Sequence, residues 1–67
     1  MNNPICFPKI LKELRIKNGL TQKALAEFLA VSPRTVSGWE RGKGLPTVEQ
    51  ALALSDRFGL PLDELFR

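Results

Sequence analysis

The sequence predicts a compact all-α domain of five short helices, and three observations support this prediction. Apolar residues recur at the three- and four-residue spacing of a helix face, and no stretch alternates apolar and polar residues as a strand does. Good helix-capping residues (Thr21, Ser32 and Thr47) each precede such a stretch. Gly and Pro cluster between the stretches, so the connections are short and the helices pack as neighbours.

The 67 residues are enough for one small domain with a modest core. We predict this domain over residues 8–67 and an irregular arm over residues 1–7, because Pro4 and Pro8 interrupt regular structure there. The single cysteine, Cys6, cannot form an internal disulfide, which fits a reducing, cytoplasmic compartment. Its thiol has no close basic neighbour in the sequence, so we expect it to be buried or inert. No run is long enough to cross a membrane.

The first helix is predicted to begin at Pro8 or Lys9 and to end at Lys17. Asn18 and Gly19 then stop it, because both residue types tolerate the left-handed conformation that ends many helices. The core-facing side of this helix is expected to hold Ile10, Leu11 and Leu14.

Two short helices joined by a tight turn follow. Thr21 caps the first of them, over residues 22–30, and Ser32 caps the second, where Pro33 suits a position that needs no backbone N–H. The second ends near Arg41 and has a narrow apolar side and a small, polar, basic outer side. Such a helix can insert into the DNA major groove, which admits a single α-helix. The expected core residues of the pair are Leu25, Phe28, Leu29, Val36 and Trp39.

A loop over residues 41–46 leads to the last two helices. Thr47 caps the fourth helix, and Glu49 in its first turn suits the positive end of the helix dipole. Gly59 ends this helix, and Pro61 opens a last short helix that reaches Phe66. The core side of the fourth helix is expected to hold Val48, Ala51, Leu52, Ser55 and Phe58.

Basic residues are concentrated in the first two thirds of the chain. Residues 9–43 carry eight Lys and Arg against three acids, a net charge of +5, whereas residues 44–67 carry two against four, a net charge of −2. A basic front and an acidic back favour an oriented encounter with a polyanion. Ordinary solubility explains the same balance equally well.

Most residues that catalysis or metal binding would need are missing. The chain has no His, the commonest general base and metal ligand, and one Cys rules out a thiolate zinc site. Asp63 and Glu64 are the only adjacent carboxylates, and on a short amphipathic helix they are expected to be solvated. The segment around Lys43 lacks the spacing and the preceding strand of a phosphate loop. We therefore expect a non-enzyme without a metal or cofactor.

A series of short motifs occurs in one order along the chain. They are Arg15, Leu20-Thr21-Gln22, Leu25-Ala26, Val31-Ser32, Thr35-Val36-Ser37, Trp39-Glu40-Arg41-Gly42, Pro46, Phe58-Gly59-Leu60 and Leu62-Asp63-Glu64-Leu65. Together they resemble the Cro/repressor-like (xenobiotic-response-element type) helix-turn-helix family over roughly residues 9–66. The resemblance implies that the second and third helices form the helix-turn-helix.

The resemblance also implies an ion pair between Arg15 and Glu40 that ties the first helix to the third. Two solvated surface charges are the alternative, but both residues fall near inner helix faces, and a partly buried charge needs a partner. Ala26 is expected on the inner face of the second helix, where the third helix must cross closely.

For DNA, the resemblance implies contacts of two kinds. Phosphate contacts are expected from Thr21 and Gln22 at a helix N-terminus. Arg41 and Lys43 could add to them, and so could Arg15 as far as Glu40 leaves it free. The Gln22 amide could also pair with adenine. Arg34 is the strongest candidate for reading a base, because Arg to guanine is the commonest specific contact, although it could be one more solvated arginine. The outer face that would read bases holds Pro33, Arg34, Thr35, Ser37 and Gly38.

Two positions depart from the family pattern. The family usually has Gly in the turn where this chain has Ala30. If that residue is left-handed, Ala costs about 1 kcal/mol; the turn could instead have a different geometry. Gly38 lacks the long polar side chain that the family often has there, which either lets the backbone approach a thymine methyl or lowers specificity.

We expect a sequence-specific DNA-binding regulator of transcription that binds a palindromic operator as a homodimer, with half-sites about one helical turn apart. At this length, repression by blocking polymerase is the simplest outcome. The dimer surface is expected at the C-terminal end, unless its apolar residues cap the core. These residues are Phe58, Leu60, Pro61, Leu62 and Phe66.

Several roles remain open within this class. A phage repressor, the antitoxin of a toxin–antitoxin pair and the controller of a restriction system would share the fold, and neighbouring genes would separate them. A protein partner such as a toxin or the polymerase is left open. The rival from another class is a protein-interaction adaptor that does not bind DNA. An adaptor would tend to have apolar or acidic residues where the third helix has Arg34 and Arg41.

Overall fold

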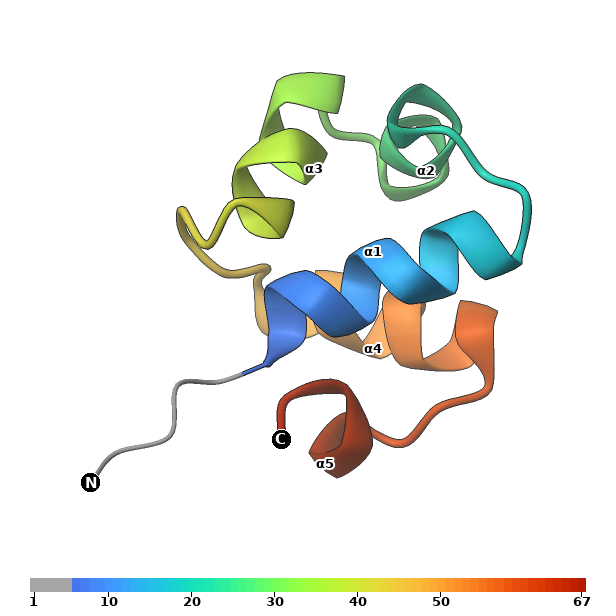
Figure 1. Cartoon of the computed structure of the whole chain (residues 1–67), viewed down its shortest axis with the longest axis vertical. Helices are drawn as coiled ribbons and strands as arrows, with labels where there is room; N and C mark the ends of the chain where they lie inside the picture. Colours follow the sequence, from blue (N-terminus) through green and yellow to red (C-terminus); the bar gives the residue numbers. More distant parts are fainter. Residues whose placement is uncertain (1–5) are drawn as a thin grey trace.

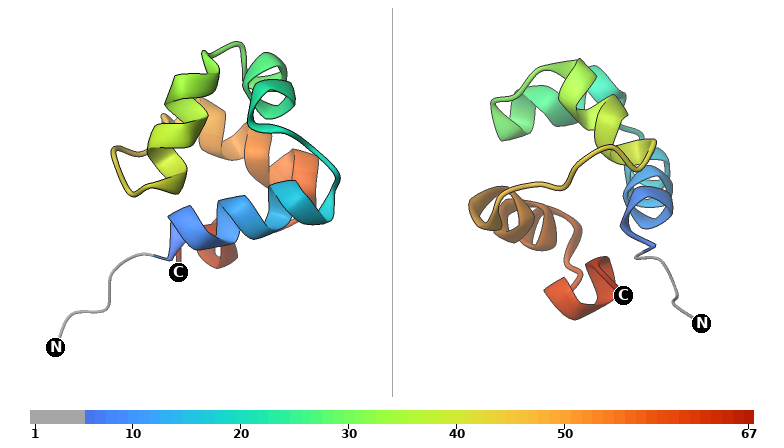
Figure 2. Two further views of the ribbon diagram at one scale, coloured as in Figure 1. Left: turned by 45° about the horizontal axis from the view of Figure 1, so that its top comes forward. Right: turned by 90° about the vertical axis from the view of Figure 1, so that its left-hand side faces the viewer.

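A computed structural model describes residues 6–67, which fold into five helices without a strand. The helices are α1 (Phe7–Lys17), α2 (Gln22–Leu29), α3 (Pro33–Glu40), α4 (Val48–Phe58) and α5 (Leu62–Leu65). Helices α2 and α3 form one end of the molecule, α5 and the C-terminus form the other, and α1 and α4 lie between them (Figures 1 and 2). The predicted all-α class and the five predicted helices are confirmed.

Helix α1 begins at Phe7, before both predicted starts, Pro8 and Lys9, and this changes the role of Phe7. Pro8 lies in the first turn of the helix, where a missing N–H costs nothing, so it starts the helix and does not interrupt it. Phe7 is completely buried, and its ring stacks on Phe66 at 4.7 Å and meets Trp39 edge-on at 6.5 Å. Phe7 therefore belongs to the core and not to an arm. The remaining prediction for the arm concerns residues 1–5, which lie outside the described part.

Cys6 was expected to be buried or inert; it is exposed, so the buried alternative is wrong. It stands at the start of α1, and its backbone N–H donates a hydrogen bond of 2.8 Å to the carbonyl of Arg67. The last described residue thus satisfies a backbone donor next to the first helix. Together with the Phe7–Phe66 stack, this bond holds the C-terminal end against α1.

The core is built from one or two residues of each helix. Its members share near-complete burial and contact one another across all five helices, and they are Phe7, Leu11, Leu25, Ala26, Val36, Trp39, Leu54 and Leu65. Ala26 is fully buried, as the close crossing of α2 and α3 requires. Leu29 and Phe58 are partly buried against this cluster.

Three residues expected in the core are exposed. Val48 is 74% exposed, Leu52 52% and Phe28 50%. On α4 the buried positions are Ala51 and Leu54, which define a side of the helix that excludes Val48 and Leu52. The predicted stripe was thus rotated around the helix axis relative to the side that meets the core. Leu54, which that stripe left out, is fully buried.

The predicted helix caps are present. The hydroxyl of Thr21 accepts the N–H of Ala24 at 2.9 Å, and the hydroxyl of Ser32 accepts the N–H of Thr35 at 3.3 Å. Thr47 forms a capping box with Gln50: its hydroxyl accepts the Gln50 N–H, and the Gln50 side chain accepts the Thr47 N–H at 2.8 Å. These bonds fix where α2, α3 and α4 begin.

Candidate nucleic-acid interface

The connection between α2 and α3 is a tight left-handed turn. Ala30 ends α2 with φ 59° and ψ 40°, and among residues 6–67 it is the one non-glycine residue with a positive φ. Ser32 then starts α3 two residues later. The turn therefore has the geometry for which the family favours Gly, and Ala30 carries the strain that the sequence suggested.

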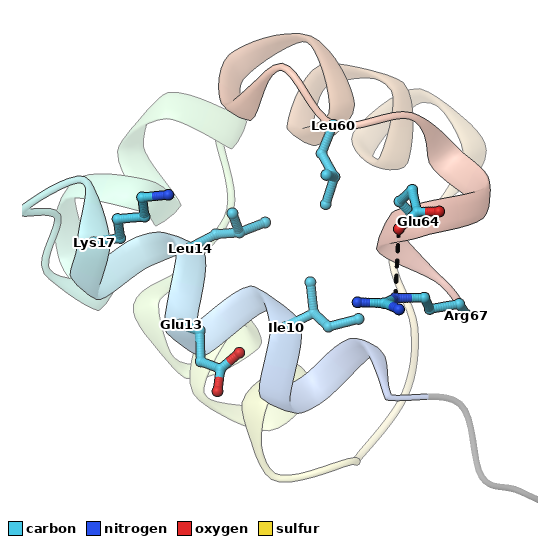
Figure 3. A pocket seen from close by; sticks show the side chains of 7 residues that line it. All are labelled: Ile10, Glu13, Leu14, Lys17, Leu60, Glu64 and Arg67. Carbon is cyan, nitrogen blue, oxygen red and sulfur yellow. Dashed lines mark ion pairs between the residues drawn. The ribbon is translucent and has the colours of Figure 1, made fainter.

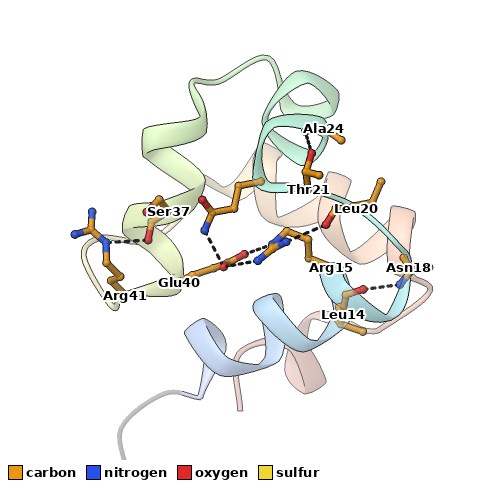
Figure 4. Close-up of polar contacts among 10 residues, drawn as sticks. Leu14, Arg15, Asn18, Leu20, Thr21, Ala24, Ser37, Glu40 and Arg41 are labelled. Carbon is orange, nitrogen blue, oxygen red and sulfur yellow. Dashed lines mark hydrogen bonds and ion pairs between the residues drawn. The ribbon is translucent and has the colours of Figure 1, made fainter.

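A network of three side chains braces α3. The Nε of Arg15 donates to Glu40 at 2.6 Å, and a second guanidinium nitrogen donates to the other carboxylate oxygen at 3.1 Å. The third nitrogen donates to the Leu20 carbonyl at 2.9 Å, and the amide of Gln22 donates to Glu40 at 3.1 Å. The carboxylate of Glu40 thus joins α1, α2 and α3 (Figure 4).

This network is shielded from solvent. The side chains of Arg15 and Glu40 are only 12% and 4% exposed, so each charge depends on the other for stabilisation. The hydrogen bonds to Glu40 raise the pKa of the Arg15 guanidinium above its ordinary value, against the opposing effect of burial. Because arginine is already charged at all physiological pH values, the pair is permanently ionised on the arginine side.

The outer face of α3 combines exposed and half-buried residues. Pro33 and Arg34 are exposed at its start, whereas Thr35 and Ser37 are half-buried. The hydroxyls of Ser32 and Thr35 are hydrogen-bonded to each other at 3.1 Å, which orients the first turn. Within the described residues, no hydrogen bond or ion pair engages the guanidinium of Arg34. It is therefore the long, unengaged cation of this face.

Gly38 borders the loop that follows α3. A Cβ added to Gly38 would lie 3.4 Å from the carbonyl oxygen of Lys43, and the Lys43 N–H donates to the Gly38 carbonyl at 2.7 Å. The loop thus folds back against this position, so Gly38 is flanked by protein on one side. Arg41 and Lys43, both exposed, lie in the same stretch, and Arg41 donates to the Ser37 carbonyl at 3.3 Å (Figure 4).

At the N-terminal end of α2, one of the two expected phosphate contacts, Gln22, is engaged within the protein. Thr21 is exposed and acts as the cap. Gln22 is half-buried, and its amide is held by Glu40. Nothing in the sequence signals this second role of Gln22, because the bond joins residues 18 positions apart. In this arrangement Gln22 orients α2 against α3, and its amide must leave Glu40 to reach a base.

Three of the five residues predicted to form a dimer surface are used by the core. Phe58, Leu60 and Phe66 pack against the buried cluster, whereas Pro61 and Leu62 are exposed. Leu60 lies along a groove between α1 and α5 that Ile10 and Leu14 also line (Figure 3). These three side chains pack on the core and remain partly exposed, so a dimer surface at the C-terminal end stays a prediction.

In residues 6–67, no cluster of His, Cys, Asp and Glu could hold a metal ion. No helix in the same residues has the length and apolarity to cross a membrane. The surface around α3, with its exposed Arg34, Arg41 and Lys43, is thus the best candidate interface.

Comparison with known proteins places this surface in context. A family model described as Helix-turn-helix matches residues 11–65. The chain is 44% identical over 59 residues to the HTH-type transcriptional activator BcrR of Enterococcus faecalis, covering 88% of this chain and 29% of that protein. It is 42% identical over 55 residues to Repressor protein CI of Enterobacteria phage phi80, covering 82% of this chain and 23% of that protein.

A solved structure agrees with these relatives. A transcriptional regulator from Listeria innocua superposes with a TM-score of 0.90 at 33% identity, over 96% of this chain and 60% of that one. The chain spans less than a third of each of the two curated relatives, so it corresponds to one domain of those longer proteins.

Proposed function

Because the chain belongs to the helix-turn-helix family of Cro/C1-type transcriptional regulators, we propose that it regulates transcription by reading a palindromic DNA operator as a homodimer. In this proposal α3 lies in the major groove and Arg34 reads a base. Thr21, Arg41 and Lys43 contact phosphates, and the protein acts in the cytoplasm. No enzymatic step is involved.

The observation that carries the proposal is the brace on α3. An α-helix reads DNA only if its outer face is held in a fixed orientation while its inner face packs on the domain. Val36 and Trp39 supply the packing, and Glu40 fixes the last turn through Arg15 and Gln22. The side chains of Arg34, Thr35 and Ser37, which lie outside this arrangement, are polar or basic. An adaptor for a protein partner needs no such basic face.

Phosphate and base contacts are expected to come from different parts of this surface. Arg41 and Lys43 follow α3 in a loop held against Gly38, so their charges border the helix and do not project from its centre. Charges in such a position fix the register on the duplex and carry no sequence information. Arg34, in the first turn of α3, is the side chain with the length and donors to reach a guanine edge.

Repression is the regulatory outcome we propose, with activation as the alternative. The two curated relatives carry opposite names, an activator and a repressor, so the shared domain serves both outcomes. A bound domain blocks polymerase wherever the operator overlaps a promoter, and activation requires an additional contact. The position of the operator relative to the promoter therefore decides between the two. An antitoxin or a restriction controller would use the same DNA-binding surface.

Selection of duplexes from a random pool, at two salt concentrations, tests the proposal. We expect an enriched motif with inverted symmetry and half-sites about 10 base pairs apart. Affinity is expected to fall steeply as salt rises, because phosphate contacts release counterions from the DNA. A pool without an enriched motif would refute sequence-specific regulation, and an enriched motif without symmetry would refute the homodimer.

A further inference from the structure

We propose that Gly38 forms a recess on α3 that accepts the 5-methyl group of a thymine in each half-site. The inference rests on the proposed function, because it names one base of the operator that α3 would read. Gly38 is then a specificity-determining residue through the side chain that it lacks. Its contact is separate from that of Arg34, so the two can be tested one at a time.

Gly38 lies on the side of α3 that points away from the core. Val36 and Trp39 are buried and define the inner side of the helix. At about 100° per residue, the opposite side carries Arg34 and, four residues later, Gly38, with Arg41 at the helix end. Arg34 and Arg41 are exposed, whereas Gly38 is half-buried. Two long cationic side chains thus flank a position that has no side chain.

The fold does not require glycine at this position. Gly38 is not among the glycines with a positive φ, unlike Gly42, whose φ is 79°. A Cβ added to Gly38 would lie 3.4 Å from the carbonyl oxygen of Lys43 and 4.0 Å from its Cβ, so it would fit. Glycine inside a helix also lowers helix stability relative to alanine. Since neither φ nor packing demands this glycine, we attribute it to what α3 contacts.

Gly38 itself has no hydrogen-bonding group left for a base. Its carbonyl accepts the N–H of Lys43 at 2.7 Å and that of Arg41 at 3.1 Å. Its N–H lies inside the helix, where it pairs with the carbonyl four residues earlier. Only the Cα and its hydrogens remain to meet a base, so the floor of the recess is apolar.

Thymine offers the apolar group that fits this floor. Of the four bases, thymine alone carries a methyl group in the major groove. The Lys43 carbonyl borders the recess as a hydrogen-bond acceptor, which disfavours the two acceptors of a guanine edge. An adenine or cytosine amino group bonded to that carbonyl is the competing arrangement. It would leave the apolar floor uncovered, whereas a methyl group covers it.

The spacing on α3 predicts where this thymine lies. Four residues rise about 6 Å along a helix, and successive bases of one DNA strand are about 3.4 Å apart. The thymine should therefore lie about two base pairs from the base that Arg34 reads. Burial of one such carbon corresponds to about fourfold in affinity, or about fifteenfold when both half-sites are counted.

Operator duplexes that differ only in this methyl group test the inference. Deoxyuridine lacks the methyl and is placed at one thymine position at a time, in both half-sites. We expect one position where uracil weakens wild-type binding about fifteenfold. Gly38→Ala fills the recess with its own methyl, so it should bind the uracil duplex at least as well as the thymine duplex. Arg34→Ala is the matched control, which should bind more weakly but keep the wild-type ratio of thymine to uracil. Circular dichroism melts verify that both variants fold.

Cytosine and 5-methylcytosine at the same position separate the methyl from an amino group. Both bases carry the amino group, and only one carries the methyl. If Gly38 reads the methyl, 5-methylcytosine should bind about fourfold more tightly than cytosine per half-site. If the two bind equally, and more tightly than thymine, the Lys43 carbonyl reads this position and the inference is overturned.

The remaining outcomes distinguish this inference from the proposed function. An enriched motif without a uracil-sensitive position overturns the inference and leaves the proposed function standing. A uracil-sensitive position that Gly38→Ala leaves unchanged also overturns it, because another residue then reads the methyl. A random pool without an enriched motif refutes the proposed function, and this inference falls with it.

Discussion

Replacing Ala30 with Gly should stabilise the domain, although it removes a methyl group. Ala30 has φ 59° and ψ 40°, a conformation that costs an L-residue about 1–2 kcal/mol. Gly adopts it freely, but Gly also makes the unfolded chain more flexible, and this offsets about 0.4–1 kcal/mol of the stabilisation. Ala30 is exposed, so no buried contact is lost. The free energy of unfolding should therefore rise by about 0.5–1 kcal/mol, and Tm by about 2–8 °C.

Urea denaturation followed by circular dichroism measures this change, and Gly59 offers the reverse experiment. Gly59 ends α4 with φ 64° and ψ 33°, nearly the same conformation, and an added Cβ would meet nothing within 4 Å. Gly59→Ala should therefore destabilise the domain by about as much as Ala30→Gly stabilises it. If Gly59→Ala destabilises and Ala30→Gly also lowers the midpoint, the left-handed geometry of Ala30 is not what limits this turn.

Three further predictions concern the brace, the core and α3, all measured by the same unfolding assay. Glu40→Lys should cost about 3–5 kcal/mol, because it leaves Arg15 buried beside a like charge; an unchanged Tm would show that the pair contributes nothing. Phe7→Ala should cost about 3–5 kcal/mol, whereas a residue in a loose arm would cost almost nothing. Gly38→Ala should raise the free energy of unfolding by about 0.5–1 kcal/mol, because Ala favours the helix and its Cβ would only touch the Lys43 carbonyl. A lower free energy of unfolding would mean that the loop cannot move to accept the Cβ.

The sequence predicted those features that depend on neighbouring residues. Thr21, Ser32 and Thr47 cap helices in the structure because a cap needs only a hydroxyl and the N–H three residues further on. The helix-turn-helix and the Arg15–Glu40 pair followed from the family resemblance, because the spacing of the motifs is specific even though each motif is weak.

Other features depend on which side of a helix meets the core, and these could not be read from spacing alone. On α4, Val48 and Leu52 are as apolar as Leu54, and only the positions of the other helices decide which of them is buried. The burial of Phe7 could not be predicted either. A proline such as Pro8 is found both where regular structure is interrupted and in the first turn of a helix, and in this chain it lies in the first turn of α1. The amide of Gln22 reaches Glu40 across 18 positions, so its partner depends on the packing of α2 on α3.

The most direct test of the central claim is the effect of Arg34→Ala on the selected duplex and on duplexes altered at each base pair. Arg57→Ala, on α4, is the matched control for the loss of one positive charge. We expect Arg34→Ala to lose about 1–3 kcal/mol of affinity and to relax discrimination at one position of each half-site, while Arg57→Ala keeps the wild-type profile. An equal loss of affinity on every duplex, or no loss at all, would contradict base reading by α3.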